Sequence, residues 1–176
     1  NLSELLKRVL AARDEVAKQR SAPIPLFLKI APDLTEDAMA DIAAEVLDKR
    51  IDGLIISNTT LSRRGATSRK AHETGGLSGQ PLFERSTMVL ARMRRLVGPA
   101  MPLIGVGGVH STETALEKIR AGADLVQIYT SMIFGGASLP GQIVAGMSAY
   151  AQRENLTSLR QIRDSRVDAW AERQLD

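Results

Sequence analysis

Short apolar runs and amphipathic stretches alternate along the chain. Apolar runs of strand length occupy residues 26–30, 53–57, 103–106 and 125–128. Around them, apolar side chains recur at helical spacing over residues 2–20, 36–47, 82–97, 112–121 and 139–153. The order is a βαβα series with one extra helix in front. Because the strands are apolar on both faces, we expect a parallel sheet that is covered on both sides.

Capping residues and the chain's tail refine this outline. Thr35 and Ser111 precede two of the helical stretches and can accept hydrogen bonds from a first helical turn. Gly122 stands where a helix typically ends. After Asn155 the pattern predicts a short helix near Leu159 and then a polar end. We therefore divide the chain into residues 1–155 and a short helical tail, 156–176.

The helical stripes also predict which side chains enter the core. Aromatic residues make up only 3% of the chain, so aliphatic residues and Met must form most of the core. The residues expected to be buried on two helices are Met39, Ile42, Ala43, Val46 and Leu47, then Val89, Leu90, Met93, Leu96 and Val97.

The number of strands limits the fold. A closed (βα)8 barrel needs eight strands and typically about 250 residues, whereas this chain of 176 residues has four apolar runs of strand length. We expect an α/β fold in which the chain supplies about the last four βα units of a TIM barrel.

Composition excludes several classes of function. The chain has no Cys and a net charge of +3, and it has no apolar run of 18 residues that could span a bilayer. The basic clusters at residues 92–95 and 160–166 have no interleaved aromatic residues, so we interpret them as solvated helix faces and expect no nucleic-acid partner. His72 and His110 are interpreted as surface residues, and no residue set has metal-ligand spacing, so no metal is expected.

Glycines and hydroxyls follow two consecutive strands. Gly107 and Gly108 end the run 103–106, and Tyr129 and Thr130 follow the run 125–128. Glycines at the carboxyl end of a strand let backbone N–H groups approach an anion. Two such ends in succession are typical of the phosphate site after the last two strands of a TIM barrel. The alternative is that these glycines serve only close packing.

Polar residues occupy other positions where barrel enzymes bind ligands. Lys29 interrupts an apolar strand, so it should face an anionic or electron-rich ligand, unless it reaches solvent from an edge strand. Asn58 and Thr59 follow another strand, and Asn can both donate to and accept from a cyclic amide. The alternative is a loop whose side chains bond their own backbone. Residues 75–82 form a glycine-rich loop that could cover a planar ligand.

Five ordered motifs resemble class 2, quinone-dependent dihydroorotate dehydrogenases. They occupy residues 28–34 (LKIAPDL), 57–60 (SNTT), 74–82 (TGGLSGQPL), 104–109 (IGVGGV) and 125–130 (LVQIYT). The resemblance covers about residues 1–150. It implies an FMN-dependent TIM barrel of pyrimidine biosynthesis that oxidises dihydroorotate to orotate and reduces a quinone.

The resemblance also implies roles for individual residues. Lys29 would lie against the flavin ring and favour the negative charge of its reduced form, and Ser57 would contact the flavin through its backbone. Asn58 and Thr59 would bind the pyrimidine. The residues expected to hold FMN, mainly at its phosphate, are Gly79, Gly107, Gly108, Tyr129 and Thr130.

The chain departs from the family pattern at two places. Ser57 occupies a position that is often Thr, and Gly136-Ala137-Ser138 follows Phe134-Gly135 where many relatives have a Pro pair. The family's catalytic Ser base and its amino-terminal membrane-associating helices belong to a first half that these motifs do not include. We therefore expect no catalytic base here and a soluble carboxyl-terminal portion that is inactive alone. The missing half would be its partner, with peripheral membrane association on the cytoplasmic or matrix side.

Two other readings of the same residues remain open. One is a phosphate-binding TIM-barrel isomerase or aldolase that uses no flavin. The other is a non-catalytic half-barrel module, whose exposed sheet edges would need a partner.

Overall fold

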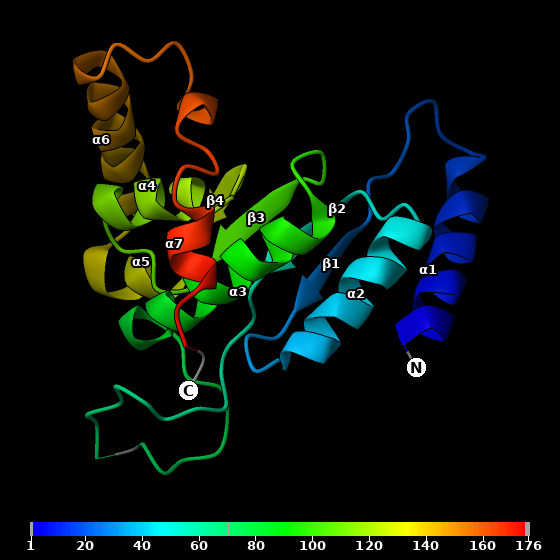
Figure 1. The fold of residues 1–176 in the computed structure, drawn as a ribbon, viewed down its shortest axis with the longest axis horizontal. Helices are drawn as coiled ribbons and strands as arrows, with labels where there is room; N and C mark the ends of the chain where they lie inside the picture. The colour runs from blue at the N-terminus through cyan, green and yellow to red at the C-terminus, as the bar shows by residue number, and fades with distance from the viewer. Residues whose placement is uncertain (1, 70, 175–176) are drawn as a thin grey trace.

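The four strands form one parallel sheet in the computed structural model, which describes residues 2–69 and 71–174. The strands are β1 (Phe27–Ile30), β2 (Gly53–Ile56), β3 (Leu103–Val106) and β4 (Leu125–Gln127), and they pair in chain order. The helices that connect them are α2 (Glu36–Asp48), α3 (Phe83–Val97) and α4 (Thr112–Arg120), with α1 (Leu2–Ala17) in front. This is the predicted βαβα series (Figure 1).

The strand register separates two faces of the sheet. Ile30, Ile56, Gly105 and Val126 are register partners, and the first three of them are buried. The adjacent row is Lys29, Ile55, Ile104 and Leu125, which is half-buried at its centre and exposed at both ends. The expectation that both faces are covered is therefore wrong for the described residues. They bury one face and leave the other, to which Lys29 belongs, partly open.

Helix α3 lies at the centre of the core. It contacts α2, β2 and β3, and its residues Val89, Leu90 and Met93 are completely buried. Two side chains of the predicted stripes are not buried, since Leu47 is 46% exposed and Leu96 is 42% exposed. Both lie at the edge of their stripe, where the helix already turns toward solvent.

The predicted helix boundaries agree closely with the structure. Thr35 accepts a hydrogen bond from the backbone N of Ala38 and begins α2. Ser111 begins α4, where its side chain and that of Thr114 cap one another's backbone N–H groups. Gly122, with φ of +114°, directly follows the last residues of that helix. These local signals therefore fix where two of the helices begin.

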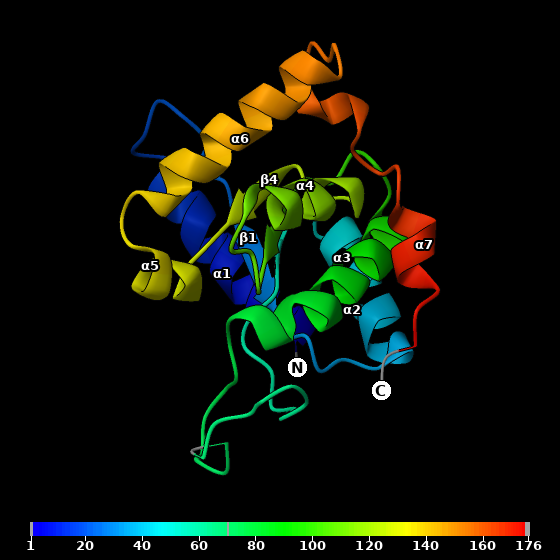
Figure 2. The same cartoon turned by 90° about the vertical axis from the view of Figure 1, so that its left-hand side faces the viewer.

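The end of the chain differs most from the prediction. A short helix α5 (Thr130–Gly135), which the sequence did not indicate, follows β4, and α6 (Leu139–Arg153) comes after it. The tail forms the predicted turn η2 (Leu159–Gln161) and then an unpredicted helix α7 (Val167–Ala171). The expected polar end is wrong, because Trp170 is 4% exposed and α7 packs on α3 (Figure 2).

The basic cluster at residues 92–95 is not a solvated face. Arg94 is 4% exposed and donates to the carbonyl O atoms of Gly98, Met101 and Gly122. It also forms an ion pair with Asp124 at 2.8 Å. The sequence did not indicate this burial because Gly122 and Asp124, which accept from Arg94, lie 28 and 30 positions away. Only Arg95 behaves as predicted, pairing at the surface with Asp168 and Glu172.

Candidate functional site

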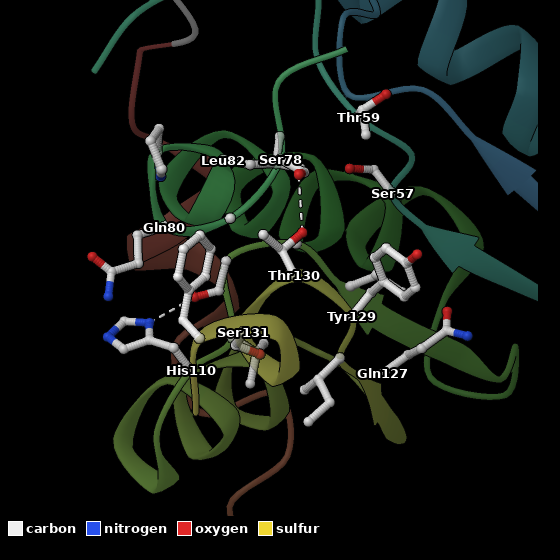
Figure 3. Close-up of a pocket in the computed structure, with 18 of the residues that line it drawn as sticks. Ser57, Thr59, Ser78, Gln80, Leu82, His110, Gln127, Tyr129, Thr130 and Ser131 are labelled. Atoms are coloured by element: carbon white, nitrogen blue, oxygen red, sulfur yellow. Dashed lines mark hydrogen bonds between the residues drawn. The ribbon is translucent and has the colours of Figure 1, made fainter. Parts of the chain in front are cut away.

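A cleft of about 920 Å³ opens at the carboxyl ends of the four strands. Its lining includes Lys29 from β1 and the residues that directly follow β2, β3 and β4. The turn η1 (Gln80–Leu82) and the loop before it form another wall (Figure 3). The nine residues predicted as a site all border this cleft, and they are Lys29, Ser57, Asn58, Thr59, Gly79, Gly107, Gly108, Tyr129 and Thr130.

The glycine pair after β3 rests directly on the first turn of α3. Gly107 and Gly108 have φ values of +106° and +74°, which side chains of L-residues rarely adopt. A Cβ on Gly108 would lie 2.4 Å from Cβ of Phe83, and one on Gly107 would lie 2.8 Å from Oγ of Ser86. Only glycine fits at both positions. The loop backbone therefore borders the cleft without side chains of its own.

The end of β4 faces the glycine-rich loop across the cleft. Thr130 donates from Oγ1 to Oγ of Ser78 at 2.9 Å (Figure 3). A Cβ on Gly79, whose φ is +78°, would lie 3.3 Å from the methyl group of Thr130. The hydroxyl of Ser131 is buried and has no hydrogen-bond partner among the described residues. This part of the cleft lining therefore includes one hydroxyl without a partner among the described residues.

Lys29 lies on the open face of the sheet. Its register partner is Ile55, and both belong to the row that faces away from the buried core. Its side chain is exposed and borders the cleft. The sequence also allowed Lys29 to reach solvent from an edge strand. In the described chain β1 is an edge strand and Lys29 is exposed, so this alternative agrees with the structure as well.

The residues after β2 combine a buried serine with an exposed amide. Ser57 is 2% exposed and donates from Oγ to the carbonyl O of Asn58 at 3.0 Å. Oδ1 of Asn58 accepts from the backbone N of Thr59 at 2.9 Å, as expected for a self-bonding loop. Nδ2 of Asn58 has no hydrogen-bond partner within the described part of the chain, and Asn58 and Thr59 are both exposed and border the cleft. The amide group can therefore still bind a ligand.

Asp33 organises this region, although the sequence analysis gave it no role. Its carboxylate accepts from Thr60 Oγ1 at 2.5 Å and from the backbone N of Leu61 at 2.8 Å. Arg85 of α3 pairs with it at 3.1 Å. Asp33 therefore ties the ends of β1 and β2 to α3. Its position shortly after β1, next to Pro32, could have indicated from the sequence that Asp33 lies at the strand ends.

His110 was interpreted as a surface residue, but it is half-buried and borders the cleft. Its Nδ1 lies 2.9 Å from the carbonyl O of Gly108. Because a carbonyl only accepts, Nδ1 must carry the proton in this contact. This hydrogen bond from the imidazole ring helps to fix the backbone of Gly108. Within the described ranges, no three His, Asp or Glu side chains gather in a way that could hold a metal ion.

Comparison with known proteins identifies the family. The family model described as dihydroorotate dehydrogenase matches residues 1–150. The chain belongs to the dihydroorotate dehydrogenase family. Curated relatives named dihydroorotate dehydrogenase (quinone) are 65% identical in Chelativorans sp. strain BNC1 and 64% identical in Rhizobium meliloti strain 1021. These matches cover 99% and 98% of this chain but 48% of each relative.

Solved structures of the dihydroorotate dehydrogenase family agree with the fold. The enzyme from Eimeria tenella in complex with ferulenol has a TM-score of 0.77 and 36% identity, covering 82% of this chain and 39% of that one. Its ligand-free form has a TM-score of 0.76 over 81% of this chain. The predicted family and the predicted partial TIM barrel are thus confirmed. The chain spans about half the length of its curated relatives.

Proposed function

We propose that this chain is the carboxyl-terminal half of an enzyme that oxidises dihydroorotate to orotate with FMN and a quinone. The observation that carries the proposal is that one cleft at the strand ends contains the glycine cradle (Gly107 and Gly108), the side chain of Lys29 and the exposed amide of Asn58. Family membership supports a flavin, and the names of the curated relatives support the substrate and the acceptor. The remaining four strands of the barrel would come from the other half.

The phosphate of FMN fits the end of the cleft that contains the glycine cradle. Gly107 and Gly108 pack against α3 without side chains, so their backbone borders the cleft, and Gly79 lies close to Thr130. The hydroxyl of Ser131 has no hydrogen-bond partner among the described residues, while the hydroxyl of Thr130 donates its proton to Ser78 and holds that residue at the cleft. Backbone N–H groups and hydroxyls are the usual partners of a phosphate at such a strand end. We assign the backbone at Tyr129 to the same group.

The flavin ring would extend from the phosphate toward β2 and β1. Ser57, buried at the end of β2, would contact the ring through its backbone. Lys29 projects from the open face of the sheet, where its ammonium would stabilise negative charge on the ring. When bound, FMN supplies the acceptor for the hydride from C6 of dihydroorotate.

The pyrimidine would lie against the exposed residues after β2. Asn58 offers a free amide N–H pair and Thr59 a hydroxyl, which match the carbonyl and N–H edge of a cyclic imide. Their hydrogen bonds would orient C6 toward the flavin. Of the described residues that line the cleft, we assign none as the base that removes the C5 proton. We assign that step to a serine of the other half.

We propose that the electron acceptor, the quinone, approaches the cleft beside α5. Exposed apolar side chains cluster there beside the cleft, with Tyr129 77%, Ile133 70% and Phe134 86% exposed. Such a surface suits an apolar quinone. Because quinones dissolve in bilayers, the proposal includes peripheral membrane association on the cytoplasmic or matrix side. None of the helices in the described ranges is both long and apolar enough to cross a membrane.

The proposal is tested on the complete protein that contains this chain. Purified protein should carry FMN, release it on denaturation, and reduce a quinone-linked dye only when dihydroorotate is added. The variant Asn58→Ala should lose activity mainly through a higher KM, because it removes pyrimidine contacts. A colourless protein that binds other sugar phosphates would favour an isomerase or aldolase and contradict the proposal.

A further inference from the structure

Lys118 of α4 is a buried cation for which the proposed reaction has no use. Its side chain is 0% exposed, between α3 and β3. Its Nζ donates to Oγ of Ser86 at 2.6 Å and lies 3.5 Å from the carbonyl O of Val106. Lysine is almost never fully buried without a paired charge, because the ammonium loses its hydration. Because the desolvation of this ammonium costs stability, we expect Lys118 to have a function at the neighbouring cleft.

Ser86 links Lys118 to the glycine cradle. Its Oγ lies 3.1 Å from the carbonyl O of Gly107 and 3.1 Å from that of Phe83. The hydroxyl has one proton for these carbonyls, so its lone pairs receive the N–H of Lys118. A chain of contacts therefore runs from Lys118 through Ser86 to the backbone that borders the cleft.

Among the residues that the structure describes, no carboxylate forms an ion pair with Lys118. The groups that α3 and β3 present to it are the Ser86 hydroxyl, the Phe83 ring, at 5.1 Å to its centroid, and the Val106 carbonyl. The other charged groups nearby are committed elsewhere. Glu117, on its own helix, pairs with Arg120 and Arg166, Arg94 of α3 pairs with Asp124, and His110 contacts Gly108.

Burial is the one cause that shifts the pKa of the Lys118 side chain. Desolvation lowers the pKa of Lys118 well below its ordinary value. An anion that arrives above the glycine cradle has the opposite effect, because opposite charges favour the ionised form and are weakly screened inside protein. Binding of an anion should therefore raise the pKa of Lys118 from its lowered value.

We propose that Lys118 is a positioning residue for the flavin phosphate, which holds the Gly107–Gly108 cradle through Ser86 and places a cationic side chain behind it. The inference rests on the proposed function, since it requires a phosphate dianion at this cradle. It makes cofactor binding an event linked to proton uptake. Lys118 touches neither flavin nor substrate in this account, so its effect on the reaction passes through the cradle.

The experiment is a calorimetric titration of the complete apoprotein with FMN, in buffers of different ionisation enthalpy between about pH 7 and about pH 10. The wild type should take up part of a proton and bind FMN more weakly as the pH rises. Lys118→Met should bind FMN about ten-fold more weakly or worse, an effect equal to about one pKa unit. Its proton uptake should vanish, while its affinity for riboflavin should not change.

Two further measurements separate positioning from structure. Apo Lys118→Met should melt at the same temperature as the wild type or higher, because the substitution removes a desolvated ammonium. Ser86→Ala should weaken FMN binding but retain proton uptake, since the charge remains. Lys49→Met, which removes a lysine paired with Glu45 on α2 outside the cleft lining, is the control and should change neither quantity.

The outcomes distinguish this inference from the proposed function. A complete wild-type protein that binds no FMN overturns the proposed function and the inference with it. A wild type that binds FMN without proton uptake overturns the inference alone, whether or not the variants fold. Equal FMN affinity in Lys118→Met and the wild type would also overturn the inference alone.

Discussion

Thr130 and Ser78 join two segments that are far apart in the chain. The hydroxyl of Thr130, the first residue of α5, donates to Oγ of Ser78 over 2.9 Å, and both residues border the cleft. The contact connects the end of β4 to the loop that leads into α3 (Figure 3). Neither segment has the extended hydrogen bonding of a strand interior. The contact therefore helps to position both segments beside the glycine cradle.

Thr130→Val should weaken FMN binding by about five- to thirty-fold, because it keeps the side-chain shape but removes the hydrogen bond that holds Ser78 at the cleft. Fluorescence titration of the complete protein measures the affinity. Thr67→Val, at an exposed position outside the cleft, is the matched control and should bind as the wild type does. Equal affinity for Thr130→Val and this control would remove Thr130 from the proposed site.

Gly108→Ala should abolish tight FMN binding and destabilise the protein by about 2 to 3 kcal/mol. The added Cβ would lie 2.4 Å from Cβ of Phe83, and φ is +74°. Gly141→Ala is the matched control, because nothing lies within 4 Å of its Cβ position on α6. There the substitution should raise stability by about 0.5 kcal/mol. Denaturant unfolding of both variants measures the difference, and equal stabilities would contradict the described loop.

Asp124 should give the protein an acid-sensitive component of stability. Burial raises the pKa of its carboxyl, but hydrogen bonds from the backbone N of Leu103, from Arg163 and from Arg94 outweigh this effect and lower it. A group with a lowered folded-state pKa stabilises above its unfolded value and loses that contribution as the pH falls through the folded value. The wild type should therefore lose stability below about pH 4.

Asp124→Asn tests this ion network. The variant should lose about 2 kcal/mol at neutral pH, and the difference from the wild type should shrink in acid. Urea unfolding over a pH series measures it. Asp168→Asn serves as the control, since the side chain of Asp168 is 82% exposed where it pairs with Arg95, and it should change stability little. A loss for Asp124→Asn that does not vary with pH would contradict the assigned ionisation.

Trp170→Ala should cost about 3 to 5 kcal/mol of stability. The indole packs edge-on against the Phe83 ring at 6.0 Å, and its Nε1 donates to Glu117 at 2.6 Å. Because Phe83 also supports Gly108, the same variant should weaken FMN binding. Trp170→Phe keeps the packing without the donor and should lose about 1 kcal/mol. Thermal unfolding that is unchanged in Trp170→Ala would show that the tail does not belong to the core.

The parts of the fold that the sequence predicted are those with strong local signals. The strand 103–106 and the helix 139–153 have the bounds that the sequence predicted. The site residues could be placed because parallel strands bring their carboxyl ends to one edge of a sheet. Ser111 likewise marked a helix start by residue type alone.

The parts that the sequence missed depend on partners far away in the chain. Trp170 belongs to a helix of five residues, which is too short to show a period. Arg94 and Lys118 are charged residues of amphipathic helices, and the acceptors of their buried hydrogen bonds include Gly122 and Ser86, which lie 28 and 32 positions away. A window of local sequence does not contain such contacts. Only the assembled structure shows that these two cations are buried.

The central claim is that the Gly107–Gly108 cradle and Thr130 hold the phosphate of a flavin. The most direct measurement is the affinity of the complete apoprotein for FMN compared with riboflavin, which lacks only the phosphate. We expect FMN to bind about a hundred-fold more tightly or better, a ratio that one or two charge-assisted hydrogen bonds can supply. That ratio should collapse toward one in Gly108→Ala. Equal affinities for FMN and riboflavin in the wild type would contradict the account.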